Sequence, residues 1–254
     1  MPSPDAIPET LWIALPFAMV AGLFLGSLCT LFVHRYVEEK PLLSPFRFPM
    51  PLRWLFSPAP AGNPERPHGP AIEVTFVLWA AALSLKFGLS WFWLANMVFG
   101  ALFIFGSFVD LRTFILPDRV TLGGFVLAIA YKAIVGLHLG NILMPLKPAL
   151  LGAGFAAGLF WVMQRVYRIV RKEEGLGTGD VKLMLPVGAL VGPAGLPFTI
   201  LAAALGAMVG SFIYMRLPGS SGFKTRIPFG PFLCFGAMLY ILVGEAAMRW
   251  YVSL

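Results

Sequence analysis

The stretch LMLPVGALVGPAGLPFTILAAALGAMVGSFIYM, residues 183–215, decides the fold class because it holds 33 consecutive residues without a formal charge. A helix needs about 20 apolar residues to cross the hydrocarbon core of a bilayer, so this stretch is too long for one span. Gly192-Pro193 and the segment 195–197 supply helix breakers. We therefore expect a short sixth membrane segment followed by a full seventh one.

The composition extends this interpretation to the whole chain. Hydrophobic residues make up 58% of the 254 residues, charged residues only 12%, and the mean hydropathy is +0.81. A soluble domain carries about twice that charged fraction. Because backbone polar groups in lipid must be satisfied within helices, the sequence predicts an all-α integral membrane protein, a polytopic bundle of about eight transmembrane helices. The other apolar runs are 10–33, 72–87, 90–110, 119–138, 148–167 and 229–252.

Three regions follow along the chain. Residues 1–33 form a retained first transmembrane helix rather than a signal peptide, because the residues before the apolar run are acidic. Residues 34–71 form a short Pro-rich cytoplasmic loop, and residues 72–254 form the membrane-embedded core. Within the core, Lys132 interrupts the run 119–138, and we expect its ammonium group to reach toward a membrane interface.

The basic residues give the expected orientation. With the N-terminus outside, 15 of the 19 Lys and Arg residues fall in cytoplasmic loops, which is a strong positive-inside bias. Both termini are then outside. The net charge of +7 is thereby explained by membrane orientation, and we expect no nucleic-acid partner. The exceptions on the outer side are Lys86, Lys132, Lys147 and Arg249.

Three aspartates, Asp110, Asp118 and Asp180, lie at the cytoplasmic ends of apolar runs. An ionisable residue at membrane depth is costly and therefore suggests a functional site. Asp118 has a structural interpretation, because it follows Pro117 at a helix start with Thr121 three residues on, as an N-cap does.

The other two aspartates also have structural alternatives. Asp180 follows Gly179 and precedes an apolar helix, where an aspartate is a suitable N-cap. Asp110 ends a helix, where the macrodipole disfavours a negative charge. Its structural alternative is an ion pair with Arg112 or Lys182. A functional alternative is a carboxyl pair in which one member stays protonated, so that one takes a proton from water and the other donates to a carbonyl.

Five segments resemble, in chain order, the motifs of the type IV prepilin peptidases. Two of them contain Asp110 and Asp180, the second within the glycine-rich sequence GLGTGD, residues 175–180. Glycines at such a site allow a substrate strand to approach the backbone closely. The segments are GSLCTLFVHRY (26–36), GPAIEVTFVLWAAAL (69–83), DLRTFILPDRVTL (110–122), EGLGTGDVKLMLPVGALVG (174–192) and RIPFGPFL (226–233).

The resemblance implies a membrane aspartic endopeptidase that needs neither a metal ion nor a cofactor. It cleaves the leader of type IV prepilins, or of the pseudopilins of type II secretion, after a glycine at the cytoplasmic face of the bacterial inner membrane. Asp110 and Asp180 match the catalytic aspartates, and Asp118 matches a position suited to capping. The remaining motif residues implied to support the site or bind substrate are Gly177, Gly179, Lys182, Pro228, Gly230 and Glu73.

The first cytoplasmic loop departs from the family pattern. Bifunctional members carry two Cys-x-x-Cys pairs there and methylate the new N-terminus with S-adenosylmethionine, whereas residues 34–71 contain no cysteine. The only cysteines, Cys29 and Cys234, lie in apolar stretches. A peptidase without methylation is therefore favoured over a bifunctional enzyme. A proton-coupled transporter or channel would require polar residues near several helix centres, and a catalytically dead assembly factor disagrees with two intact aspartate motifs.

Overall fold

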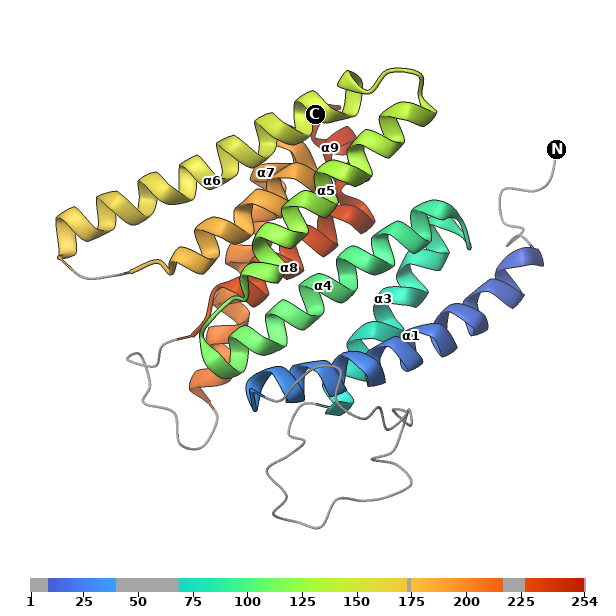
Figure 1. Cartoon of the computed structure of the whole chain (residues 1–254), viewed down its shortest axis with the longest axis horizontal. Coiled ribbons are helices and arrows are strands. Elements are labelled where there is room, and N and C mark those ends of the chain that lie inside the picture. Colours follow the sequence, from blue (N-terminus) through green and yellow to red (C-terminus); the bar gives the residue numbers. More distant parts are fainter. Residues whose placement is uncertain (1–8, 40–68, 173–174, 217–226, 254) are drawn as a thin grey trace, which may run out of the picture. The chain divides into compact units, whose positions relative to one another are not determined.

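The computed structural model describes residues 9–39, 69–172, 175–216 and 227–253, and its regular elements in these ranges are all helical (Figure 1). The elements are α1 (Glu9–Val37), α3 (Gly69–Phe87), α4 (Trp91–Thr113), α5 (Asp118–His138), α6 (Leu143–Arg171), α7 (Thr178–Met215), α8 (Gly230–Leu239), the π-helix η2 (Tyr240–Gly244) and α9 (Glu245–Val252).

The predicted all-α membrane class is confirmed. Seven helical segments in the described ranges are long and apolar enough to cross a membrane. The predicted run 72–87 is part of the helix α3. The sequence predicts about eight membrane spans. The structure gives seven because the two spans expected within residues 183–215 belong to one helical element, α7. Most of the predicted cytoplasmic loop, residues 40–68, lies outside the described residues.

The chain divides into two compact units, Met1–Phe108 and Val109–Leu254. In the first unit, α1 packs against α3 through glycines. A Cβ atom at Gly22 would lie 2.8 Å from the carbonyl oxygen of Phe76, and one at Gly26 would lie 2.8 Å from the Cα of Glu73. Only a residue without a side chain permits so short an approach, which is typical of small-xxx-small pairs between membrane helices.

In the second unit, α7 packs on α6 and then changes direction at Gly192, whose φ of 69° and ψ of 174° are not helical. Before the break, Gly188 meets Gly152 of α6 backbone to backbone. After it, Gly210 lies against the ring of Phe232 in α8. A straight helix of 38 residues would be about 57 Å long, whereas the second half of α7 turns back toward the end at which α7 begins (Figure 1). The predicted break at Gly192 is confirmed.

Lys132 of α5 stabilises this break. Its Nζ donates a hydrogen bond to the carbonyl oxygen of Leu190 at 2.9 Å. The non-helical Gly192 and the missing N–H of Pro193 deprive the preceding turn of helical donors. A cation at a helix C-terminus also interacts favourably with the macrodipole. The broken helix thus supplies the ammonium group with an acceptor inside the protein. That Lys132 reaches toward a membrane interface stays a prediction.

Candidate active site

Asp110 lies in the last turn of α4, in the part of that helix that belongs to the second unit. The helix ends just after it, where the N–H of Phe114 donates to the carbonyl oxygen of Asp110 at 2.8 Å and Phe114 adopts a φ of 55°. The Asp110 side chain is buried, with 5% of its surface exposed. Its carboxyl group accepts a hydrogen bond from the backbone N–H of Gly230, the first residue of α8.

Asp180 lies in the first turn of α7, where the positive end of the helix dipole favours a carboxylate. It is also buried, at 9% exposure, and its carboxyl group accepts a hydrogen bond from the backbone N–H of Gly177. Asp110 and Asp180 interact electrostatically with each other. The structure thus brings together, within one unit, two acidic groups that are 70 residues apart in the sequence.

Three predicted glycines surround this carboxyl pair. A Cβ atom at Gly177 would lie 3.5 Å from Oδ2 of Asp180, and one at Gly230 would lie 2.5 Å from Oδ2 of Asp110. A Cβ atom at Gly179 would lie 3.2 Å from the Cβ of Leu116. The absence of side chains therefore lets backbone N–H groups approach both carboxyl groups directly.

Leu116 is a residue of this site that sequence reasoning missed. It is buried, with 7% of its surface exposed, and it contacts Gly179 on one side and Gly230 on the other. An apolar residue in an apolar chain gives no signal of its own. The only available hint was its place between Asp110 and the Pro117-Asp118 pair.

Gln164 is a second residue that the sequence did not single out. Its Nε2 donates a hydrogen bond at 2.8 Å to the carbonyl oxygen of Leu176, and the side chain is 8% exposed. The neighbouring Gly175 lies directly against the ring of Tyr167, also in α6. Two contacts from α6 therefore hold the glycine-rich segment that leads into Asp180. A buried glutamine in an apolar helix was the available signal, because an amide at such a position needs partners.

Asp118 and Lys182 form an ion pair, with Nζ of Lys182 2.7 Å from Oδ1 of Asp118. The pair joins the first turn of α5 to the first turns of α7, and it is exposed, at 62% for the Asp118 side chain and 43% for that of Lys182. The expected N-cap role of Asp118 is wrong. Pro117 occupies the N-cap position and Asp118 is the first helical residue, so its carboxylate pairs with the lysine.

The last two predicted positions, Pro228 and Glu73, belong to different units of the chain. Pro228 precedes α8 by two residues, in the segment that leads into Gly230. Glu73 belongs to α3 in the first unit, where it is buried, at 4% exposure, against Gly26 of α1. The glycines, the two aspartates and the Asp118–Lys182 pair all belong to the second unit.

This arrangement suits acid–base chemistry. Two carboxyl groups that interact electrostatically can share one proton, so that one can donate a proton while the other accepts one. In the described ranges, no cluster of three or more His, Cys, Asp or Glu side chains suits a metal ion. The polar groups that the structure places at this site are the two carboxyl groups and the backbone N–H groups of Gly177 and Gly230.

Comparison with known proteins agrees with this site. Residues 97–212 match the type IV leader peptidase family. Through this segment, which is less than half of the chain, the protein is similar to that family. The matched segment includes both aspartates, Asp118 and Lys182, and it ends before Gly230, which the structure adds to the site. No solved structure shows a significant match.

Several bacterial proteins named prepilin leader peptidase/N-methyltransferase are similar to this chain. That of Xanthomonas campestris pv. campestris is 31% identical over 193 residues, covering 76% of this chain and 64% of the relative. That of Pseudomonas aeruginosa is 30% identical over 185 residues, covering 72% and 61%. That of Legionella pneumophila is 33% identical over 147 residues, covering 58% and 48%. The chain thus spans less than two thirds of the length of these relatives.

Proposed function

We propose that this chain is a prepilin leader peptidase with an aspartic mechanism. It hydrolyses the peptide bond after the glycine that ends the leader of type IV prepilins or type II secretion pseudopilins. The observation that carries the proposal is the pair of buried, interacting carboxyl groups of Asp110 and Asp180 at the ends of α4 and α7. The similarity of residues 97–212 to a peptidase family supports the reaction class.

In the proposed reaction, the ionised carboxyl group takes a proton from water, and the water oxygen attacks the scissile carbonyl carbon. The protonated carboxyl group donates its proton to the carbonyl oxygen, which gives a neutral tetrahedral intermediate. When the intermediate collapses, the C–N bond breaks, the leaving nitrogen receives a proton, and the hydroxyl proton returns to the pair. One proton is again shared between Asp110 and Asp180, as the cycle requires.

The backbone around the pair has a proposed role in orientation. The N–H groups of Gly177 and Gly230 hold one carboxyl group each, and the absence of a side chain at Gly179 leaves room beside Leu116. The Asp118–Lys182 pair positions the start of α7 from outside the site. Pre-organised groups of this kind lower the cost of reaching the reactive geometry.

The proposed location is the bacterial inner membrane, with the site at the cytoplasmic face and both termini outside. The distribution of Lys and Arg supports this orientation. The turn at Gly192 supports it as well, because it returns the chain to the side of Asp180 before the basic residues that follow α7.

A second candidate activity is N-methylation of the mature product. The relatives' names include an N-methyltransferase, whereas residues 34–71 lack the cysteine pairs of bifunctional members. Mass spectrometry of the mature N-terminus distinguishes the two. We expect an unmodified amine, and a product 14 Da heavier per methyl group would establish the bifunctional enzyme.

A further inference from the structure

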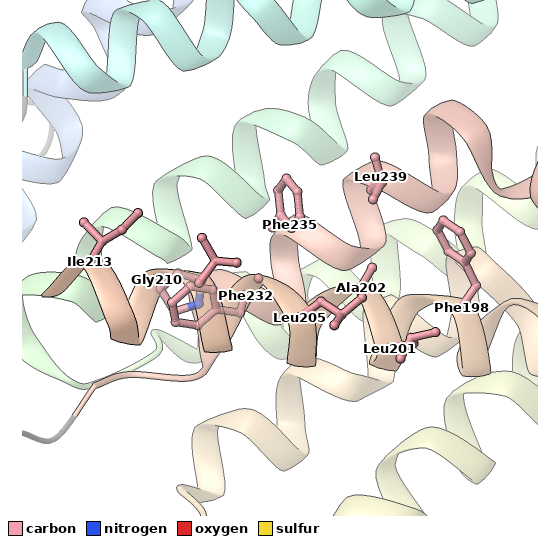
Figure 2. Close-up of a pocket in the computed structure, with 12 residues that line it drawn as sticks. Phe198, Leu201, Ala202, Leu205, Gly210, Ile213, Phe232, Phe235 and Leu239 are labelled. Carbon is pink, nitrogen blue, oxygen red and sulfur yellow. The ribbon is translucent and has the colours of Figure 1, made fainter. Parts of the chain in front are cut away.

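An apolar groove of about 700 Å³ runs along the second unit between α8 and the second half of α7. Figure 2 shows side chains from both helices along it, with Phe198 and Ile213 toward its two ends. Both small residues of α7 and aromatic residues of α8 line the groove. Among the lining residues are Ala202, Leu205, Gly206, Gly210, Phe232 and Phe235.

The small residues follow a helical spacing. Ala202, Gly206 and Gly210 are four residues apart, so they lie along one face of α7. The rings of Phe232 and Phe235 rest near the two glycines, and a Cβ atom at Gly206 would lie 3.4 Å from the Phe235 ring. The small residues therefore let α8 pack closely on α7, and the side of the groove that stays open presents Leu205 and Phe235.

The groove is long enough for a membrane helix. Phe198 and Ile213 are 15 residues apart, which corresponds to about 22 Å along a helix. That length matches about three quarters of the hydrocarbon thickness of a bilayer. An occupant in the membrane must satisfy its own backbone hydrogen bonds, which a helix does.

One end of the groove adjoins the carboxyl pair. Pro231 and Phe232, which line the groove, directly follow Gly230, whose N–H binds the carboxyl group of Asp110. The side chains of Leu205 and Phe235 are each 51% exposed, so the groove is open along its length. A polypeptide that leaves the groove at this end reaches the site of hydrolysis.

From this continuity we infer that the groove binds the apolar membrane helix of the protein whose leader is removed. The helix lies along the open side of the groove, against Leu205 of α7 and Phe235 of α8. Its end at Pro231 then presents the adjoining peptide bond to Asp110 and Asp180. The inference rests on the proposed peptidase function and adds the position of the substrate's membrane segment.

Two substitutions of the same type test the groove. Ala202→Trp fills it, whereas Ala204→Trp places the same side chain on an exposed position of α7 outside the lining. Cleavage of a full-length prepilin is measured in phosphatidylethanolamine–phosphatidylglycerol vesicles. We expect Ala202→Trp to raise KM about tenfold, which corresponds to about 1.4 kcal/mol of binding free energy, with little change in kcat. Ala204→Trp should match the wild type. Equal KM values for both variants would overturn the inference.

Disulfide crosslinking tests the position of the helix directly. Leu205→Cys is placed in a Cys29→Ala, Cys234→Ala, Asp180→Asn background, and the prepilin carries single cysteines along its apolar segment. Leu151→Cys on α6, where Leu151 is 66% exposed, is the control. We expect crosslinks from Leu205→Cys alone, at prepilin positions three or four residues apart. Crosslinks of equal yield from the control, crosslinks only between two copies of the enzyme, or no crosslinks, as for a groove filled by lipid, would refute the inference.

The two levels of the proposal fail differently. If the wild type does not cleave prepilin, the peptidase assignment fails. If Asp180→Asn still cleaves it, the catalytic assignment of Asp180 fails. If the wild type cleaves and Asp180→Asn does not, while Ala202→Trp behaves as the wild type, only the groove assignment fails.

Discussion

Gly230→Ala is the substitution whose effect follows most directly from the geometry of the site. The added Cβ would lie 2.5 Å from Oδ2 of Asp110 and 2.9 Å from Cδ1 of Leu116. Ordinary van der Waals contact begins near 3.4 Å. The carboxyl group or the start of α8 must therefore move by about 0.9 Å, the difference between 3.4 and 2.5 Å.

The backbone N–H of residue 230 remains available in this variant, so the loss comes from displacement alone. A shift of about 1 Å in a reacting group reduces the rate by about 100-fold, which corresponds to about 2.7 kcal/mol in the activation free energy. We therefore expect kcat for prepilin cleavage to fall about 100-fold in Gly230→Ala.

The assay is the initial rate of prepilin cleavage at saturating substrate, followed by the mobility shift of the shortened product. Gly154→Ala in α6 is the matched control, because a Cβ atom there meets nothing within 4 Å. It should retain the wild-type rate. Thermal unfolding in detergent checks that the Gly230→Ala enzyme is folded. A folded variant that keeps kcat within threefold of the wild type would refute the proposed contact between Gly230 and Asp110.

Three further predictions concern residues around the site. Lys132→Met removes the donor to the carbonyl oxygen of Leu190 and should lower the free energy of unfolding by about 1.5–3 kcal/mol. Thermal or denaturant unfolding in detergent measures this change, and unchanged stability would contradict the role of Lys132 at the helix break. Gln164→Leu frees the glycine-rich segment before Asp180 and should reduce kcat for prepilin cleavage more than it raises KM; an unchanged kcat would argue against that support. Asp118→Asn breaks an exposed ion pair worth about 0–1 kcal/mol, so substantial cleavage should remain, and complete loss would assign Asp118 a direct part in the reaction.

The membrane fold was predictable from the sequence because hydropathy reports the solvent of each segment. The run 183–215 predicted both membrane-spanning helix and a break in that helix. The break lies at Gly192, one of the predicted helix breakers. The partner of Lys132 was not predictable, because its acceptor is created 58 residues further along the chain by the non-helical geometry of Gly192. Tertiary structure, rather than the local sequence, decides where that ammonium group lies.

The candidate site was predictable to a different degree. Charge scarcity and motif resemblance identified Asp110 and Asp180, and the structure places both in one unit as a buried, interacting pair. Leu116 and Gln164 were not predicted as site residues, because their roles depend on contacts with glycine-containing segments that are distant in the sequence. The role of Asp118 was mistaken because local sequence suggests a cap wherever an aspartate follows Pro117, whereas its ionic partner comes from α7.

The central claim is that Asp110 and Asp180 together carry out the hydrolysis, and their conservative replacement tests it most directly. Wild type, Asp110→Asn and Asp180→Asn are each purified, checked for equal thermal stability, and incubated with the same prepilin in lipid vesicles. Each asparagine keeps the shape of the side chain and removes the acidic group. The account predicts complete processing by the wild type and no detectable processing by either variant. Processing at the wild-type rate by either folded variant would contradict it.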